Sequence, residues 1–232
     1  AAAMIISLLL VFFHAPTEQV MGPVQKIFYF HVPSAYSMYL AWLISTVGAV
    51  AALSTNREKW EYLAAAAAEI ALVFAAMVMV SGPLWGRRAW GAFWVWDPRL
   101  TTSLLLALII LATVILRTFD RSNAARRFAA ATTIVGTCII PLIHISVQMW
   151  RGQHPTVLRS GGLAPDMLFV FAVCMISFTG MLAVLLHWRL RLAFLLARED
   201  ELRHSPPPAA QYVPVDPASL GTVSATGLLA TA

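Results

Sequence analysis

The chain has 232 residues, of which 59% are hydrophobic and 12% are charged, and its mean hydropathy is +0.75. A soluble core of this length cannot bury so much apolar surface, so the composition indicates an integral membrane protein. The net charge of +5 comes from basic residues spread over the loops between apolar runs, and membrane topology explains this pattern more simply than nucleic-acid binding does.

Six apolar runs follow one another along the chain. The first, Ala1 to Phe13, is shorter than the roughly 20 residues that span a bilayer. We expect a truncated or trimmed first helix rather than a signal peptide, because no basic segment precedes the run. Pro33 suits the first turn of the second span, and Pro141 is expected to kink the fifth. The other spans are predicted at Val32–Leu53, Tyr62–Val80, Leu100–Leu116, Ala129–Val147 and Met167–His187.

The predicted fold is all-α and membrane-integral, with six transmembrane helices in residues 1–205 and a tryptophan-rich outer loop at 85–101. Residues 206–232 are rich in proline and small side chains, so we expect a disordered cytoplasmic tail. Ten basic residues lie in the loops after spans two and four and in the tail: Arg57, Lys59, Arg117, Arg121, Arg126, Arg127, Arg189, Arg191, Arg198 and Arg203. Six lie on the other side: Lys26, Arg87, Arg88, Arg99, Arg151 and Arg159. The positive-inside rule therefore predicts cytoplasmic termini and a periplasmic loop 85–101.

The loop between spans three and four reads WGRRAWGAFWVWDPRLT. It holds half of the chain's eight tryptophans: Trp85, Trp90, Trp94 and Trp96. Interfacial anchors usually scatter over many helix ends, whereas these four lie within twelve residues. The loop therefore favours a surface that binds a large, flat, amphipathic ligand over a simple anchor belt.

The local geometry of this loop can also be predicted. If residues 90–97 are helical, then Trp90, Phe93, Trp94 and Asp97 share one face of that helix. Gly86 and Gly91 would allow another surface to approach the backbone closely.

Histidines flank the loop on the same side of the membrane. His31 lies in FYFHVPSAY at the outer end of span two, and His154 lies in WRGQHPTVL beyond span five. Two imidazoles on opposite faces can hold a haem iron by both axial positions; the alternative is an interfacial hydrogen bond for each. His144, inside span five, is a competing candidate, and local sequence does not choose between it and His154. The chain has no CxxCH motif, so it does not attach a c-type haem to itself.

Charged side chains could complete such a site. Arg99, Lys26, Arg87 and Arg88 are candidates to pair with haem propionates, with lipid headgroup contact as the alternative. Asp97 would either pair with Arg99 or accept a hydrogen bond from a ligating histidine. Glu69 lies within span three, where a carboxylate is costly, and we expect a structural hydrogen bond there rather than a proton path.

The loop resembles the signature WGxxWxWDxRLT of the WWD-domain family, which handles haem in cytochrome c maturation. From roughly Lys26 to His187, the chain resembles the CcmC-type members of that family, with six spans and a histidine in each outer loop beside the signature. FYFHVPSA is similar to their first histidine motif. PLIHISVQMWRGQH is similar to the second, in which the histidine a few residues after the tryptophan is the ligand, so the resemblance favours His154 over His144. The short first span and the proline-rich tail depart from the family pattern.

The resemblance implies a haem-delivery protein rather than an enzyme. It implies non-covalent, transient binding of haem b at the periplasmic face of the inner membrane, with His31 and His154 as axial ligands. Haem would pass to the chaperone CcmE, and the chain could promote its covalent attachment there. CcmA, CcmB and CcmD would be further partners, and ATP use would lie in a partner because the chain has no nucleotide-binding loop. The implied platform and propionate contacts are Trp85, Gly86, Trp90, Gly91, Trp94, Trp96, Asp97, Arg99 and Lys26.

The sequence is also compatible with three other functions. A CcsA-type cytochrome c synthase subunit would have more spans and histidines inside them. A transmembrane haem transporter needs polar groups through the membrane depth, for which only Glu69 and His144 give support. A structural membrane subunit would use the tryptophans as anchors alone.

Overall fold

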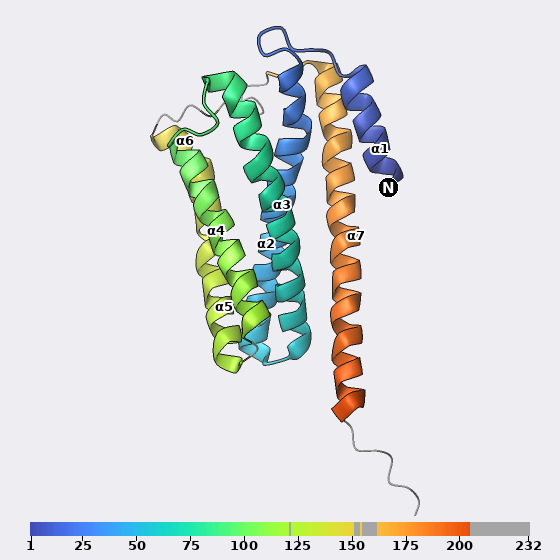
Figure 1. Ribbon diagram of the computed structural model, residues 1–232, viewed down its shortest axis with the longest axis vertical. Coiled ribbons are helices and arrows are strands. Elements are labelled where there is room, and N and C mark those ends of the chain that lie inside the picture. The colour runs from blue at the N-terminus through green and yellow to red at the C-terminus, as the bar shows by residue number, and fades with distance from the viewer. Residues whose placement is uncertain (121, 151–153, 155–161, 205–232) are drawn as a thin grey trace, which may run out of the picture. The chain divides into compact units, whose positions relative to one another are not determined.

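The protein is described here by a computed structural model that covers residues 1–120, 122–150, 154 and 162–204 (Figure 1). Within those residues the regular structure is helical, apart from an isolated antiparallel bridge between Glu18 and Gly22. The helices are α1 (Ala2–Leu9), η1 (Leu10–His14), η2 (Pro23–Ile27), α2 (Phe28–Thr55), α3 (Glu58–Trp90), α4 (Pro98–Phe119), α5 (Asn123–Thr137), α6 (Ile139–Met149) and α7 (Pro165–His204). The chain divides into two units, Ala1–Leu195 and Leu196–Ala232, and the expected tail at 206–232 lies outside the described residues.

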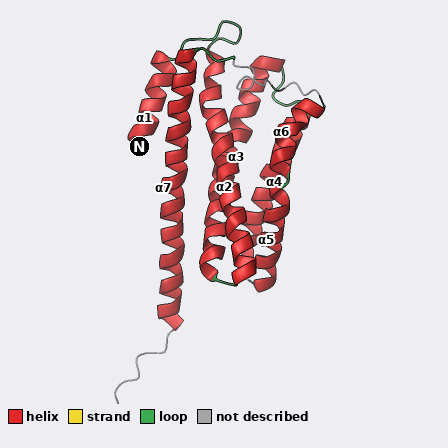
Figure 2. Cartoon of the chain, turned by 180° about the vertical axis from the view of Figure 1, so that it is seen from behind, coloured by secondary structure: helices red, strands yellow, loops and turns green. Residues whose placement is uncertain are grey.

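Long apolar helices make up most of the first unit (Figure 2). Five helical segments are long and apolar enough to cross a membrane: Pro23–Thr55, Glu58–Trp90, Pro98–Phe119, Asn123–Ser146 and Pro165–His204. The apolar helix Ala2–His14 is shorter. Because so many described residues belong to helices of this kind, the prediction of an all-α, multi-pass membrane protein is confirmed.

The tryptophan-rich segment is only partly a loop. Helix α3 continues ten residues beyond the predicted end of span three, so Trp85 and Trp90 lie on its last turns. Gly91 then adopts a left-handed conformation with φ +76° and ends the helix. The helix considered for residues 90–97 therefore does not form, because a glycine that accepts positive φ terminates one helix and Asp97 begins the next as the N-cap of α4.

The fifth predicted span is broken near its middle. Helix α5 ends at Thr137 and α6 begins at Ile139, with Cys138 between them. Pro141 explains the position of the break, because proline lacks an N–H and its ring clashes with the carbonyl four residues earlier, which is that of Thr137. The kink expected at this proline is confirmed as an interruption.

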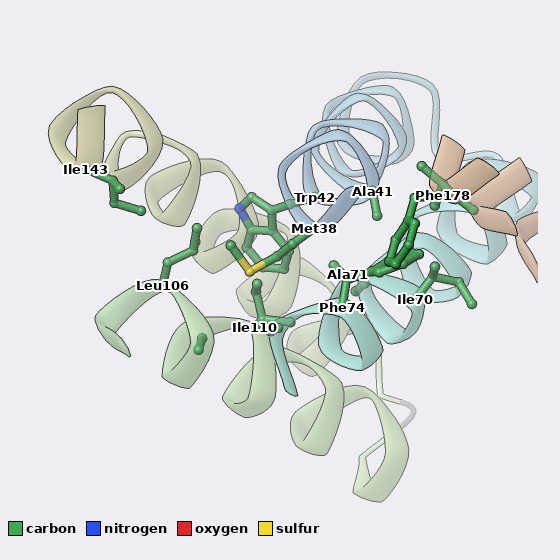
Figure 3. Packing of buried hydrophobic residues seen from close by; sticks show 14 residues of the cluster. Met38, Ala41, Trp42, Ile70, Ala71, Phe74, Leu106, Ile110, Ile143 and Phe178 are labelled. Carbon is green, nitrogen blue, oxygen red and sulfur yellow. The ribbon is translucent and has the colours of Figure 1, made fainter. Parts of the chain in front are cut away.

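The core joins α2, α3, α4, α6 and α7. Figure 3 shows Met38 and Trp42 of α2 facing Leu106 and Ile110 of α4. Phe74 of α3 is fully buried in the same cluster. In the membrane such packing is driven mainly by close contact between side chains, because lipid is as apolar as the core itself.

Helices α2 and α3 approach each other closely at Gly48, which has no side chain. A Cβ built on Gly48 would lie 2.8 Å from the backbone nitrogen of Ala64, too close for any side chain. One turn earlier, the hydroxyl of Ser45 donates a 2.7 Å hydrogen bond to the Ala64 carbonyl. Small residues therefore bring the two backbones together here, as is common between membrane helices.

Helix α7 is held to α3 by a few large or charged side chains. Glu69 of α3 accepts two hydrogen bonds from Arg189 of α7, at 2.6 Å from Nη2 and 2.5 Å from Nε. The rings of Phe74 and Phe178 lie 6.4 Å apart. The predicted structural hydrogen bond of Glu69 is thus an ion pair between helices.

Candidate functional site

One end of the first unit collects most of the residues of interest. The N-terminal ends of α2 and α4 and the C-terminal ends of α3 and α6 lie at this end (Figure 1). His31 lies in the first turn of α2, and Trp85 and Trp90 lie in the last turns of α3.

His31 is held by Ser81 of α3. The Nδ1 atom of His31 lies 2.9 Å from the Ser81 hydroxyl oxygen, and that hydroxyl donates its own proton to the Met77 carbonyl at 2.6 Å. A hydroxyl has one proton, so Nδ1 of His31 must carry the proton in this contact and Ser81 must accept it. The neutral ring then keeps its lone pair on Nε2, which is the form that ligates a metal.

Gly82, which follows Ser81 in the chain, leaves space for the imidazole ring of His31. A Cβ added at Gly82 would lie 3.2 Å from Cε1 of His31. The ring therefore packs directly against the backbone of α3, and this close approach favours glycine. Ser81 and Gly82 together fix both the protonation and the placement of His31.

The tryptophans of α3 extend this surface toward His154. The rings of Trp85 and Trp90 meet edge to face with centroids 5.1 Å apart. The imidazole of His154 lies 6.2 Å from the Trp85 ring, tilted by 36°. Gly86 lies under Trp90, since a Cβ there would be 3.2 Å from the indole ring. His154 thus lies beside Trp85 at the tryptophan surface.

Electrostatics connect the two histidines. The imidazole of His31 contacts Ser81 and Gly82, one helical turn before Trp85, whose ring lies 6.2 Å from that of His154. His154 and Arg99 are also the charged groups that act on His31. The structure therefore brings together His31, His154, Arg99 and the tryptophans of α3. Neighbouring residues 151–153 and 155–161, which include Arg151 and Arg159, lie outside the described residues.

The segment after Gly91 carries the remaining tryptophans. The rings of Trp94 and Trp96 lie 5.9 Å apart, edge to face, and Trp96 is 77% exposed. The indole nitrogen of Trp94 is buried and has no hydrogen-bond partner within the described part of the chain. Arg87 donates to the Gly91 carbonyl, which fixes the start of this segment.

Asp97 has a role at a helix start. Its carboxylate accepts a 2.8 Å hydrogen bond from the backbone N–H of Arg99, and it is 6% exposed. Asp is a favoured N-cap because its carboxylate satisfies an N–H of the first turn, and Pro98 suits the next position. Asp97 therefore orients the start of α4 and, with it, Arg99.

Two other candidates make contacts elsewhere, and a third is exposed. The ammonium of Lys26 donates to the Phe12 carbonyl at 3.1 Å and lies 5.9 Å above the Phe12 ring, so the structure places it on η1. His144 lies 2.9 Å from the carbonyl of Ile140 in its own helix, and its ring is 5.4 Å from that of Tyr39. Arg88 is exposed.

Sequence reasoning missed Ser81 and Gly82. A signal was present, because Ser81 precedes Trp85 by four residues and Gly82 precedes Gly86 and Trp90 by four and eight. Residues at this spacing share one helix face. The helix had been predicted to stop at Val80, so this periodicity was not extended to the tryptophans.

Comparison with known proteins shows which family the chain resembles. The family model described as heme exporter protein C matches residues 1–205. A heme exporter protein C of Bradyrhizobium diazoefficiens is 36% identical over 178 residues, which cover 75% of this chain and 67% of that protein. The Haemophilus influenzae protein of the same name is 30% identical over 194 residues, covering 82% of this chain and 78% of the relative.

A further relative aligns over a shorter stretch. The Escherichia coli heme exporter protein C is 33% identical over 141 residues, or 60% of this chain. The alignment spans 58% of that protein, less than two thirds of its length. Since the family model covers most of the sequence, the family assignment does not depend on this alignment. The chain belongs to the heme exporter protein C family, multi-pass membrane proteins of cytochrome c biogenesis.

Proposed function

We propose that the chain holds haem b, non-covalently, between its tryptophan surface and the two histidines His31 and His154, and delivers it for cytochrome c maturation. The observation that carries the proposal is the hydrogen bond from His31 to Ser81, which leaves Nε2 of this imidazole free as a neutral ligand for iron. His154, beside Trp85, would supply the second axial ligand.

The surroundings suit the rest of a haem. The rings of Trp85, Trp90 and Trp94 offer aromatic faces to a flat macrocycle. The buried indole N–H of Trp94 lacks a partner among the described residues, and a buried donor of this kind favours a ligand that supplies an acceptor. Arg99, near His31, would pair with a propionate. Lys26, which lies on Phe12, would reach a propionate only after leaving that contact.

The proposed topology has six spans. Helix Ala2–His14 would be the first, and the five long apolar helices would follow. Ten basic residues lie at the α2–α3 and α4–α5 turns and between Arg189 and Arg203, against six on the other side, and this bias supports a cytoplasmic location for both termini. The haem site would then face the periplasm from the inner membrane, with residues 85–101 as its WWD loop.

The proposed partners follow from the family resemblance. The haem chaperone CcmE would receive haem and become covalently attached to it, while CcmA and CcmB would provide ATP-driven release and CcmD would assist. The chain itself would act as a binding and presenting protein rather than an enzyme. The Glu69–Arg189 pair weakens the case for a transporter, because the carboxylate within α3 already has a structural partner.

An absorption spectrum of the purified protein tests the proposal. We expect the wild type to retain haem with two histidine ligands. His31→Ala and His154→Ala should each lose haem or change its spin state, whereas the control His144→Ala should retain it, because His144 contacts its own helix. A wild type without haem, or loss in His144→Ala alone, would refute the assignment.

A further inference from the structure

A concave site lies at the other end of the helices. It is a cavity of about 340 Å³, within the range of small-molecule sites, roughly 300–1,000 Å³. The end of α2 and the beginnings of α3 and α5 line it. The lining residues are Ala52, Leu53, Asn56, Arg57, Glu58, Glu61, Asn123, Arg126, Arg127 and Ala130.

Positive charge exceeds negative charge around this cavity. Glu61 is paired with the buried guanidinium of Arg117, and Glu58 lies 3.7 Å from Arg126. Both lining carboxylates are thus neutralised. Arg57 and Arg127 also line the cavity, and neither has an acidic partner within residues 1–120 and 122–150 or in the described remainder. The cavity therefore has two arginines in excess.

Arg117 adds an unusual feature behind Glu61. Its side chain is 7% exposed, and its Nε and Nη2 atoms have no hydrogen-bond partner among the residues the structure describes. Leaving such donors without an acceptor is costly. The pair with Glu61 alone does not satisfy this guanidinium, which does not itself line the cavity but places a further positive charge behind Glu61.

The backbone contributes to the same positive character. Helix α3 begins at Glu58 and α5 begins at Asn123, and both of these first helical residues line the cavity. Helix N-termini favour anions through their unpaired N–H groups and the helix dipole. Ala52, Leu53 and Ala130 give the cavity an apolar wall. An anion attached to an apolar body would match both parts of this lining.

We propose that this cavity binds a phosphate group, and that the group belongs to the headgroup of an acidic glycerophospholipid. Arg57 and Arg127 would hold the phosphate oxygens through charge-assisted hydrogen bonds. The acyl chains would continue along the apolar surface of helices that span the membrane. A basic pocket between membrane helices is a setting in which anionic headgroups bind. The site is independent of the proposed haem site, which lies at the opposite helix ends.

The test compares two variants that each remove two positive charges. Arg57→Gln/Arg127→Gln removes the cavity arginines, and Lys59→Gln/Arg198→Gln removes two cations that do not line the cavity. The full chain is purified in micelles that contain equal amounts of phosphatidylglycerol and phosphatidylcholine, and native mass spectrometry counts the retained lipids. A parallel arm uses phosphatidylcholine alone, adds inorganic phosphate, and follows thermal unfolding. Arg57→Lys/Arg127→Lys, which keeps the charge, guards against a folding defect.

The wild type and the Lys59/Arg198 variant should retain phosphatidylglycerol over phosphatidylcholine, and the Arg57/Arg127 glutamine variant should retain it roughly tenfold less. The lysine variant should retain an intermediate amount. Stabilisation by inorganic phosphate without lipid preference would support the phosphate chemistry but identify a soluble source. Equal lipid retention by both glutamine variants, with no effect of phosphate, would overturn the proposal.

Discussion

The hydroxyl of Ser81 takes part in two hydrogen bonds, one received from His31 and one given to Met77. Ser81→Ala removes the acceptor that holds the Nδ1 proton, so the imidazole of His31 can rotate and change tautomer. Loss of such a supporting partner usually weakens metal binding about 10- to 100-fold. We expect haem retention to fall within that range, measured by titration of haem into the purified protein. Ser54→Ala is the control, because Ser54 is exposed and bonds only to a nearby carbonyl; an equal loss there would contradict the role of Ser81.

Trp94 allows a test of the indole N–H apart from the ring. Trp94→Phe keeps an aromatic face but removes the buried donor, which has no partner among the described residues. We expect haem affinity to fall about five- to tenfold, which corresponds to the net contribution of roughly one ordinary hydrogen bond. Thermal stability without haem should stay equal or rise, because an unsatisfied buried donor disappears. A loss of stability without loss of haem affinity would instead indicate a packing role.

At this scale the sequence predicted the kinds of residue better than their contacts. Histidines, tryptophans and arginines were selected because haem needs such groups, and His154 lies beside Trp85. Ser81 could not be paired with His31 from sequence, since fifty residues separate them. Asp97 could have been identified as a cap, because Asp followed by Pro is a helix-start signal.

Among the helices, the contact of α2 with α3 depends on Gly48. Gly48→Ala places a Cβ at 2.8 Å from the backbone of Ala64, and a backbone atom cannot rotate away. The helices must separate, so we expect a loss of about 1–3 kcal/mol in the free energy of unfolding. Unfolding in mixed micelles monitored by circular dichroism measures it. Gly180→Ala is the matched control, because no atom lies within 4 Å of its added Cβ; it should be neutral or stabilise slightly.

Element type was predictable and element ends were not. Runs of about 20 apolar residues specify membrane helices by length alone, and all five long ones are present. Trp90, Phe93, Trp94 and Asp97 repeat at helical spacing and would share one face of a helix over residues 90–97. Gly91 overrides that periodicity, since its positive φ stops the helix one residue after Trp90. Periodicity describes side chains, whereas the end of a helix is decided by the backbone.

On the scale of the whole molecule, Glu69 and Arg189 tie α7 to α3. Glu69→Leu leaves the guanidinium without its partner at a position that is 31% exposed. We expect a loss of about 1–3 kcal/mol, less than for a fully buried pair, and faster amide hydrogen exchange along α7. Glu69→Leu/Arg189→Leu should recover most of the stability.

The exposed pair of Arg203 with Glu199 serves as a control. It lies within one helix, and Glu199→Leu should change stability by less than about 0.5 kcal/mol. If Glu69→Leu is no worse than this control, or if the double variant is as unstable as the sum of the single ones, the pair does not anchor α7.

The arrangement of helices is the part that sequence could not supply. Glu69 was recognised as a costly membrane carboxylate, yet its partner is 120 residues away. The cavity at the other helix ends also remained unnoticed, because Arg57 and Arg127 appeared only as topology signals. Proximity between residues on different helices depends on packing, which apolar composition hardly constrains.

The length of α3 determines how far the tryptophan surface stands from the lipid chains. With 33 residues, the helix is about 50 Å long, whereas the hydrocarbon layer is only about 30 Å thick. When the apolar part of α3 up to Val80 lies in that layer, the ten residues from Ser81 to Trp90 rise about 15 Å above it. His31 lies level with Ser81, at the start of this rise, so a ligand bound between His31 and Trp90 would extend from the edge of the hydrocarbon layer into the aqueous compartment. A water-soluble carrier could therefore collect it without any part of the carrier entering the bilayer.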